Sequence, residues 1–188
     1  LFGPLKSGKS TLMNAMSAAY VSEVTSLPAY PCMVYVSDDD TRQFTVTRYS
    51  GEAEVFQDPA ALRMQVARAH TDLAERIREV EASGAEFDPV LHFDEAIRRV
   101  DVKVPAGELA ESGSVLVDTP GLYSRMKFGY DRMTREFRNA AACAIFVVKT
   151  DNLFLEQVFN EFNQLLDLFS RIFLVVNLDS TKRDVMPD

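Results

Sequence analysis

Short apolar runs alternate with helical patterns along the chain. Six runs rich in β-branched and aromatic residues predict strands, and several are nearly continuous apolar, as strands buried on both faces should be. The runs are Met33 to Val36, Phe44 to Tyr49, Val100 to Val104, Val115 to Asp118, Ala144 to Val148 and Ile172 to Asn177.

Three segments between these runs have apolar residues at three- and four-residue spacing, which predicts helices over Ala60 to Ala82, Tyr130 to Ala141 and Leu155 to Phe169. A fourth helix is implied from Lys9 to about Tyr20. Strands separated by helices of this length imply right-handed crossovers. The pattern therefore predicts an α/β fold with a mostly parallel central sheet that is covered on both faces.

The composition is that of a folded domain. The 188 residues include 28 Asp plus Glu and 20 Lys plus Arg, so the formal net charge is −8, and 47% are hydrophobic. This length and hydrophobicity support one domain with its own core, which excludes disordered and low-complexity classes. The acidic balance, without any run of Lys and Arg, argues against nucleic acid as a partner.

The cysteines and the apolar runs bear on location. Cys32 and Cys143 lie in apolar stretches with no Cys or His at ligand spacing, so we expect reduced, packed thiols in a cytoplasmic protein. The longest strongly apolar run, Ala140 to Val148, is less than half of the ~20 residues that span a bilayer. No charged and apolar leader opens the chain, so we expect neither export nor a membrane span.

The strongest motif stands at the start of the chain and has the form G-x-x-x-x-G-K-[ST], which predicts a loop that wraps a polyphosphate with its backbone N–H groups. Gly3 and Gly8 permit conformations and close approaches that a side chain would block. We expect Lys9 to neutralise the β- and γ-phosphates, Ser10 to ligate Mg²⁺ and Thr11 to meet the α-phosphate. The predicted phosphate-binding residues are Gly3, Pro4, Leu5, Lys6, Ser7, Gly8, Lys9, Ser10 and Thr11.

A second motif, D-x-x-G, follows a predicted strand as Asp118-Thr119-Pro120-Gly121. An Asp at the carboxyl end of such a strand can hold Mg²⁺ through a water molecule, and the Gly121 amide can sense a γ-phosphate. Loss of that phosphate would release the segment after Gly121, which describes a switch. Alone this is an ordinary turn sequence, but downstream of a phosphate loop it favours a nucleotide switch.

A third motif that would read the base is imperfect. Asn177-Leu178-Asp179 follows an apolar strand, where guanine-specific proteins have [NT]-K-x-D. If Asn177 is the first residue of the motif, the Asp comes one position early; if Asp179 is its Asp, Val176 and Asn177 stand where Asn or Thr and Lys belong. We favour the second register, because the carboxylate accepts bonds from the guanine N1 and N2 hydrogens that adenine lacks.

With these motifs the chain resembles the GTPase domain of the dynamin superfamily, most closely bacterial dynamin-like proteins and more distantly mitofusins. The resemblance spans nearly all of the chain and rests on Phe2 to Ala15, Leu27-Pro28 and Pro31-Cys32 in the first switch, Asp118 to Gly121, and Phe173 to Asp179. It implies a P-loop NTPase three-layer sandwich with an insertion between the phosphate loop and D-x-x-G.

The resemblance also implies boundaries and partners. The chain starts with Leu1 rather than Met and ends at Asp188, so we expect residues 1–188 to be a single G domain cut from a longer protein at both ends. The family implies GTP or GDP with Mg²⁺ as ligands, a homodimer across the nucleotide face, and membrane lipid as a partner of regions outside this segment. The expected location is cytoplasmic, with peripheral attachment at the inner face of the membrane.

Two positions depart from the family pattern. Met33 follows Pro31-Cys32, where the family has a Thr that binds Mg²⁺ and helps to hold the attacking water; Thr25 and Ser26 are the nearest hydroxyls. Lys6 stands where eukaryotic members have a Ser, and it is a candidate to take part of the transition-state charge. We therefore expect slow GTP hydrolysis, with Lys6, Lys9, Ser10 and Gly121 as the catalytic candidates.

Three functions remain open at this point. The first is a GTP-hydrolysing mechanochemical G domain that dimerises with nucleotide and belongs to a membrane-remodelling protein. The second is a scaffold or switch that binds GTP or GDP with little or no hydrolysis, which the Met33 departure permits. The third is a P-loop ATPase or kinase, which leaves D-x-x-G unexplained.

Overall fold

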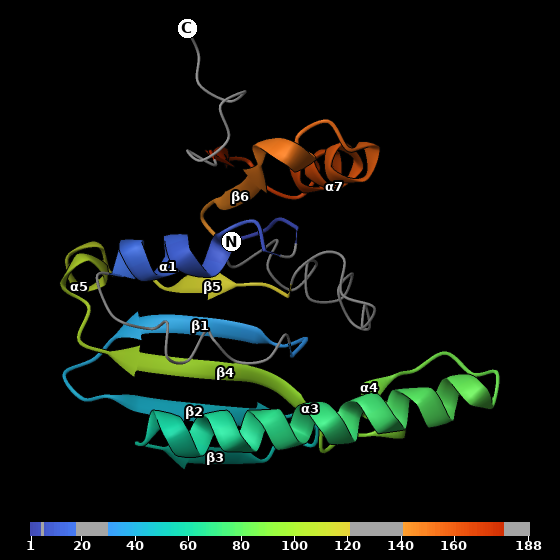
Figure 1. The fold of residues 1–188 in the computed structure, drawn as a ribbon. Helices are drawn as coiled ribbons and strands as arrows, with labels where there is room; N and C mark the ends of the chain where they lie inside the picture. Colours follow the sequence, from blue (N-terminus) through green and yellow to red (C-terminus); the bar gives the residue numbers. More distant parts are fainter. Residues whose placement is uncertain (5, 18–29, 121–140, 179–188) are drawn as a thin grey trace, which may run out of the picture. The chain divides into compact units, whose positions relative to one another are not determined.

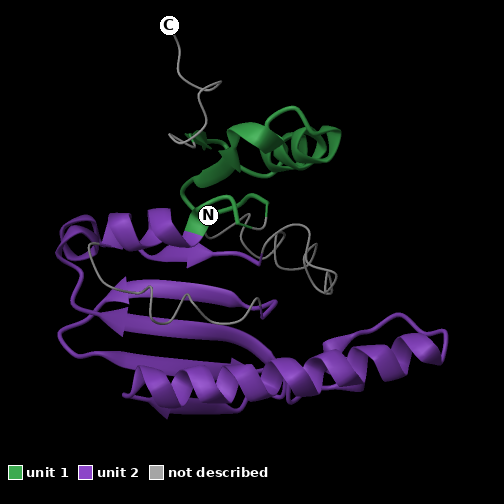
Figure 2. Cartoon of the chain, in the orientation of Figure 1, with its two compact units in different colours: residues 1–9, 121–188 green, residues 10–120 purple. Residues whose placement is uncertain are grey.

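The structure is a computed structural model and describes residues 1–4, 6–17, 30–120 and 141–178 (Figure 1). The chain divides into two compact units: unit 1 contains residues 1–9 and 121–188, and unit 2 contains residues 10–120 (Figure 2). The helix predicted over Tyr130 to Ala141 lies outside the described residues, apart from Ala141 itself. In the described part of the chain, no helix combines the length and the apolar character that crossing a membrane requires.

Unit 2 is built on a five-stranded sheet with the strand order β3-β2-β4-β1-β5. Only β1 and β4 run parallel, and the three other pairings are antiparallel. The strands are β1 (Met33–Asp38), β2 (Gln43–Arg48), β3 (Ala53–Phe56), β4 (Ile97–Val104) and β5 (Leu116–Asp118).

The prediction of a mostly parallel sheet is wrong for these five strands. Residues 49–52 join the neighbours β2 and β3 as a hairpin, and residues 39–42 join β1 to β2, which lie on either side of β4. Both connections are too short for a parallel crossover, which needs a dozen or more residues. The parallel pair β1 and β4 is the one separated by a long helix. Strand β3 was not predicted, since its four residues include Glu54 and carry no strong apolar pattern.

This sheet is apolar on one face and polar on the other, so the expectation of strands buried on both faces is also wrong here. Cross-strand partners share a face, and Phe44 pairs with Val102 while Val46 pairs with Val100, all fully buried. On the opposite face Asp101 pairs with both Thr45 and Tyr35. The alternating burial along β4 is typical of a sheet with one wet face.

Arg99 contacts two other side chains on the polar face of this sheet. Arg99 donates to both carboxylate oxygens of Asp101, at 2.6 and 2.8 Å, and its guanidinium lies 4.8 Å from the centre of the Tyr35 ring. The hydrogen bonds from Arg99 to Asp101 raise the pKa of the arginine further. Arg99 therefore links β4 to β1 on the polar face of the sheet.

Helix α3 (Pro59–Ala82) confirms the predicted long amphipathic helix. Asp58 caps its start by accepting bonds from the N–H groups of Ala60 and Ala61 at 2.9 and 3.3 Å, and Pro59 occupies the first turn, where a missing N–H costs nothing. Its stripe of buried residues consists of Leu62, Val66, Ala69, Leu73, Ile77 and Val80. The other helices of this part of the chain are α1 (Lys9–Ser17), α4 (Pro89–His92) and α5 (Gly107–Ser112).

Tyr30 connects α3 to the start of β4. Its buried hydroxyl accepts a hydrogen bond from the Ile97 N–H at 2.9 Å, at the end of β4 where the pairing with β2 shifts register. Its ring meets the His70 ring of α3 edge-on at 6.2 Å. Burial raises the pKa of Tyr30 above its usual range, so this hydroxyl stays protonated and keeps the strand end satisfied.

Unit 1 contains a β-α-β arrangement that matches the predicted elements. Strands β6 (Ala144–Lys149) and β7 (Ile172–Asn177) are parallel, with the short 3₁₀ helix η1 (Thr150–Asn152) and helix α7 (Glu156–Leu166) between them. Phe2 forms a parallel bridge to Phe146 of β6. The core is partly aromatic, because Phe2 packs on Phe169 and Phe146 on Phe162, each pair at 5.4 Å between ring centres.

The two cysteines differ in a way that the sequence did not predict. Both are free thiols, but only Cys32 is packed, whereas Cys143 is exposed. The expectation of two packed thiols is therefore wrong for Cys143, which precedes the first buried residue of β6. Burial raises the pKa of the Cys32 thiol to about 12.

We predict that iodoacetamide at pH 8 modifies only Cys143 in the folded protein. The nucleophile is the thiolate, which the Cys32 site disfavours and shields from reagent. Mass spectrometry should find one labelled cysteine without denaturant and two in guanidinium chloride. Labelling of Cys32 in the folded protein at a rate similar to that of Cys143 would contradict the burial of Cys32.

Candidate functional site

The loop between Phe2 and α1 is shaped by two glycines that no other residue could replace without strain. Gly3 has φ +136°, and a Cβ added to it would lie 2.0 Å from the Val147 carbonyl oxygen. Gly8 has φ +104°, and its added Cβ would lie 2.7 Å from Asn177 Nδ2. The predicted need for glycine at both motif positions therefore has a steric cause, which is the close approach of β6 on one side and of the end of β7 on the other.

Between these glycines the loop contains a residue in the left-handed region. Lys6 has φ +61° and is the one non-glycine residue with positive φ in the described chain. The Ser7 N–H closes a turn onto the Pro4 carbonyl at 3.2 Å, and the Lys6 side chain is exposed.

Lys9 places its charge inside this loop. Its side chain is buried at 6% exposure, and Nζ donates to the carbonyl oxygens of Gly3 and Pro4 at 3.0 and 2.9 Å. A buried ammonium is costly unless it is hydrogen-bonded, so the two carbonyls stabilise it inside the loop. The loop can therefore neutralise a bound anion with a charge that is already positioned.

Asn177 connects the end of β7 to the same loop. Its Nδ2 donates to the Ser7 carbonyl oxygen at 2.9 Å, and the same group lies against Gly8. Sequence reasoning placed Asn177 among the nucleotide-binding residues but missed this direct bond to the loop. The signal for it was the parallel order of β6 and β7 beside Phe2, because the carboxyl ends of parallel strands meet at one edge.

In unit 2 the structure brings together the two predicted metal ligands. Ser10, in the first turn of α1, donates from Oγ to Asp118 Oδ2 at 3.1 Å, and Asp118 is the last residue of β5. The described residues contain no group of three or more His, Cys, Asp or Glu that could hold a metal ion by themselves. A hydroxyl with one carboxylate suits Mg²⁺, which keeps several waters and takes its other ligands from substrate phosphates.

The segment predicted as the first switch leads into β1. Met33 is the first residue of β1, pairs with Arg99 and is buried at 2% exposure. Its thioether therefore belongs to the core. Thr11, predicted to meet the α-phosphate, is exposed on α1.

Several predicted site residues lie outside the described part of the chain. They are Leu5 in the phosphate loop, Gly121 of the D-x-x-G motif, Asp179 of the base-reading segment, and the two hydroxyl residues of the first switch, Thr25 and Ser26. Their roles stay predictions.

Comparisons with known proteins place the chain in a family. A search of curated proteins gives no match. Two solved structures, both described as an oligomerised bacterial dynamin pair for long-range sensing and tethering of membranes, are 15% and 13% identical to this chain, with TM-scores of 0.47 and 0.41. They match 98% and 97% of this chain, which spans only 31% and 30% of their length.

The sequence profile described as the dynamin family matches residues 1–179. The match includes the phosphate loop, Asp118 and Asn177 with their contacts described above. The chain therefore belongs to the dynamin family, whose G domains bind guanine nucleotide.

Proposed function

We propose that this chain binds GTP and GDP with Mg²⁺ and hydrolyses GTP slowly, as the G domain of a bacterial dynamin-like protein. The observation that carries the proposal is the prebuilt phosphate loop, in which the buried Lys9 ammonium lies against the Gly3 and Pro4 carbonyls. The ammonium is therefore already inside the loop, where a bound polyphosphate needs a positive charge.

The loop residues supply the phosphate contacts. In this proposal the N–H groups from Gly8 to Ser10 donate to the phosphates, because the Ser7 N–H already donates to the Pro4 carbonyl, and the start of α1 adds the favourable end of its dipole. Lys9 adds a full charge toward the β- and γ-phosphates. Ser10 and Asp118 would hold Mg²⁺, Asp118 through water, and the ion would neutralise phosphate charge.

The base is read, in this proposal, by the segment after β7. Asp179 accepts hydrogen bonds from guanine, while Asn177 holds the start of that segment to the phosphate loop. Because one end of the nucleotide binds beside Ser7 and the other near Asp179, the Asn177 bond sets the spacing between the two subsites.

A scaffold that binds GTP without turning it over is the second candidate, and the position of Met33 favours it. The residue after Pro31-Cys32 is a methionine, which has no hydroxyl to offer to Mg²⁺ or to an attacking water. Its side chain is also buried in β1. Hydrolysis then depends on the remaining groups, with Lys6 as the exposed cation of the loop. Undetectable GTP turnover at high protein concentration, with K⁺ and lipid present, would select the scaffold.

Dimerisation and membrane action belong to the proposal through family membership. We propose that two copies meet across the nucleotide face, and that regions outside this segment contact lipid from the cytoplasmic side. The acidic chain, at net charge −8, is not itself suited to anionic lipid.

Lys9→Ala should abolish nucleotide binding. The variant removes a charge from the loop, and charge-assisted hydrogen bonds contribute about 1.5–3 kcal/mol each, so we expect affinity for GTP and GDP to fall by about a hundredfold or more. Titration with a fluorescent GDP analogue measures this, with Lys103→Ala as a control at a lysine that pairs with Asp39. A Lys9→Ala protein that keeps its nucleotide affinity would refute the phosphate-loop assignment.

The protein should prefer GTP and GDP over ATP by about a hundredfold or more, since adenine would leave the Asp179 carboxylate without donors. Calorimetric titration of the three nucleotides gives the ratio, and Asp179→Ala should reduce it. Equal affinity for ATP and GTP in the unmodified protein would refute the proposal that Asp179 selects guanine.

Lys6→Ala should lower the GTP turnover number by about tenfold to a thousandfold while changing GTP affinity by only a few-fold, because a preorganised charge acts mainly on the transition state. Single-turnover phosphate release and nucleotide titration separate the two effects. If both rate and affinity are unchanged, Lys6 takes no part in catalysis.

A further inference from the structure

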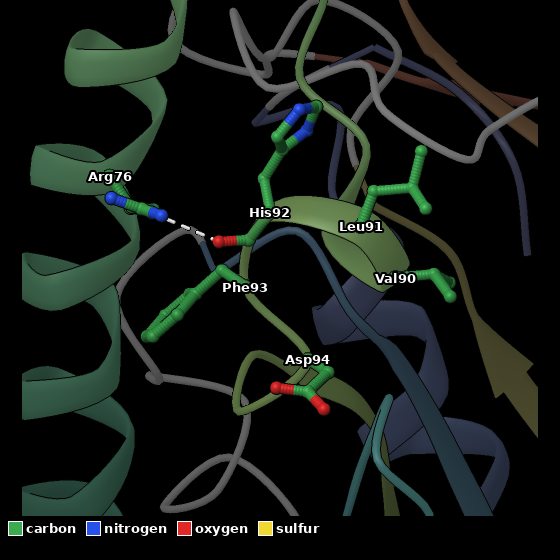
Figure 3. Close-up of a pocket in the computed structure, with 6 residues that line it drawn as sticks. All are labelled: Arg76, Val90, Leu91, His92, Phe93 and Asp94. Carbon is green, nitrogen blue, oxygen red and sulfur yellow. Dashed lines mark hydrogen bonds between the residues drawn. The ribbon is translucent and has the colours of Figure 1, made fainter.

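The described chain contains a second candidate site, a hollow in unit 2 between α3 and α4 that no proposed step uses (Figure 3). Its volume is about 470 Å³. It is lined by Arg76 of α3, by Val90, Leu91 and His92 of α4, and by Phe93 and Asp94, which follow α4. We call it the α4 hollow.

The walls of the α4 hollow are fixed by hydrogen bonds. Arg76 donates from Nε to the His92 carbonyl oxygen at 2.9 Å, and this bond attaches α4 to α3. Arg76 also pairs with Glu79 of its own helix at 2.9 Å. The Asp88 carboxylate accepts from the Val90 N–H at 2.8 Å, and the Asp88 N–H donates to His92 Nδ1 at 2.9 Å. The short helix is therefore held in one conformation, and the surface that it presents is preformed.

Two aliphatic side chains are exposed on this surface. Val90 is 49% exposed and Leu91 is 78% exposed, and both side chains extend from α4 away from Arg76 (Figure 3). Two neighbouring branched aliphatic side chains on a rigid helix form a patch that a partner's apolar side chain can cover. Binding there would lose little conformational entropy, because the helix is already ordered.

The surroundings of the α4 hollow are acidic. Residues 75–95 include two cations, Arg76 and Arg78, and seven carboxylates, which are Glu75, Glu79, Glu81, Glu86, Asp88, Asp94 and Glu95. Glu79 and Glu95 form ion pairs with Arg76 and Arg48. Within the described ranges no ion pair involves Glu81, Glu86 or Asp94, which are exposed.

We propose that the α4 hollow is a docking site for a basic amphipathic segment of a protein partner. One apolar side chain of the segment packs on Val90 and Leu91, and its Lys or Arg side chains pair with Asp94 and the neighbouring carboxylates. This is the helix-in-groove mode of recognition, with specificity from charge. A nucleic acid or an anionic membrane would meet the same carboxylates and be repelled, and two acidic hollows would repel each other.

The test uses a 14-residue fluorescent peptide of Leu and Lys with helical spacing, titrated with the 188-residue chain and followed by anisotropy. We expect saturable binding that weakens as salt increases. Leu91→Ser and Asp94→Lys should each weaken binding by about tenfold, since the first removes the apolar contact and the second reverses a charge. Both side chains are exposed, so the fold should tolerate either change.

Met64→Ser is the matched control, because Met64 is 71% exposed on α3 but does not line the hollow. A peptide of Leu and Glu with the same spacing controls for apolar attraction alone. Unchanged binding in both hollow variants, an equal loss in Met64→Ser, or equal binding of the Leu and Glu peptide would each overturn the proposal. Vesicles of phosphatidylglycerol that bind through Leu91 would assign the site to a membrane instead and overturn it too.

Discussion

The phosphate loop depends on being held from two sides by parallel strands. On one side Gly3 lies against the Val147 carbonyl, where any side chain would collide, and Phe2 is hydrogen-bonded to β6 at 2.8 Å in both directions. On the other side Asn177 donates to the Ser7 carbonyl and lies against Gly8. In both contacts the loop takes part through its backbone atoms. The contacts therefore fix the conformation of the loop rather than the identity of its side chains.

That constraint explains the form of the loop in between. A segment clamped at Gly3 and Gly8 must turn sharply, and it does so by placing Lys6 in the left-handed region that non-glycine residues avoid. Strain of this kind persists only where the surrounding structure over-determines it, as it does at ligand-binding loops. The same turn brings the Gly3 and Pro4 carbonyls to the Lys9 ammonium, so clamping, strain and charge placement have one cause.

Unit 2 is organised differently, around a mainly antiparallel sheet with one apolar face. A hairpin connection makes β2 and β3 antiparallel neighbours, and the polar face is stabilised by Arg99, which contacts Tyr35 and Asp101. Its long helix α3 extends beyond the strands of this sheet (Figure 1) and carries the α4 hollow toward one end. The acidic charge of the chain, which at first only argued against nucleic acid, is thus locally concentrated beside exposed aliphatic side chains.

Local pattern was sufficient for much of the molecule. Apolar runs located six of the seven strands, and the stripe from Leu62 to Val80 located α3, because burial of one face imposes its period on the sequence. The motif glycines and Lys9 could be assigned because phosphate binding requires those residue types at that spacing. Strand direction could not be assigned in this way, because it depends on connection length and on which neighbour each edge meets.

By itself, then, the sequence determined most of the strands, the long helix α3, the family and the chemistry of the phosphate loop, because each of these is encoded in a local pattern. Only the tertiary structure decided that three of the four pairings in the five-stranded sheet are antiparallel, that Cys143 is exposed while Cys32 is buried, and that Asn177 bonds to Ser7. Each of these depends on a contact between segments far apart in the chain. Such contacts are set by how the packed elements exclude water and satisfy their hydrogen bonds, which no local pattern records.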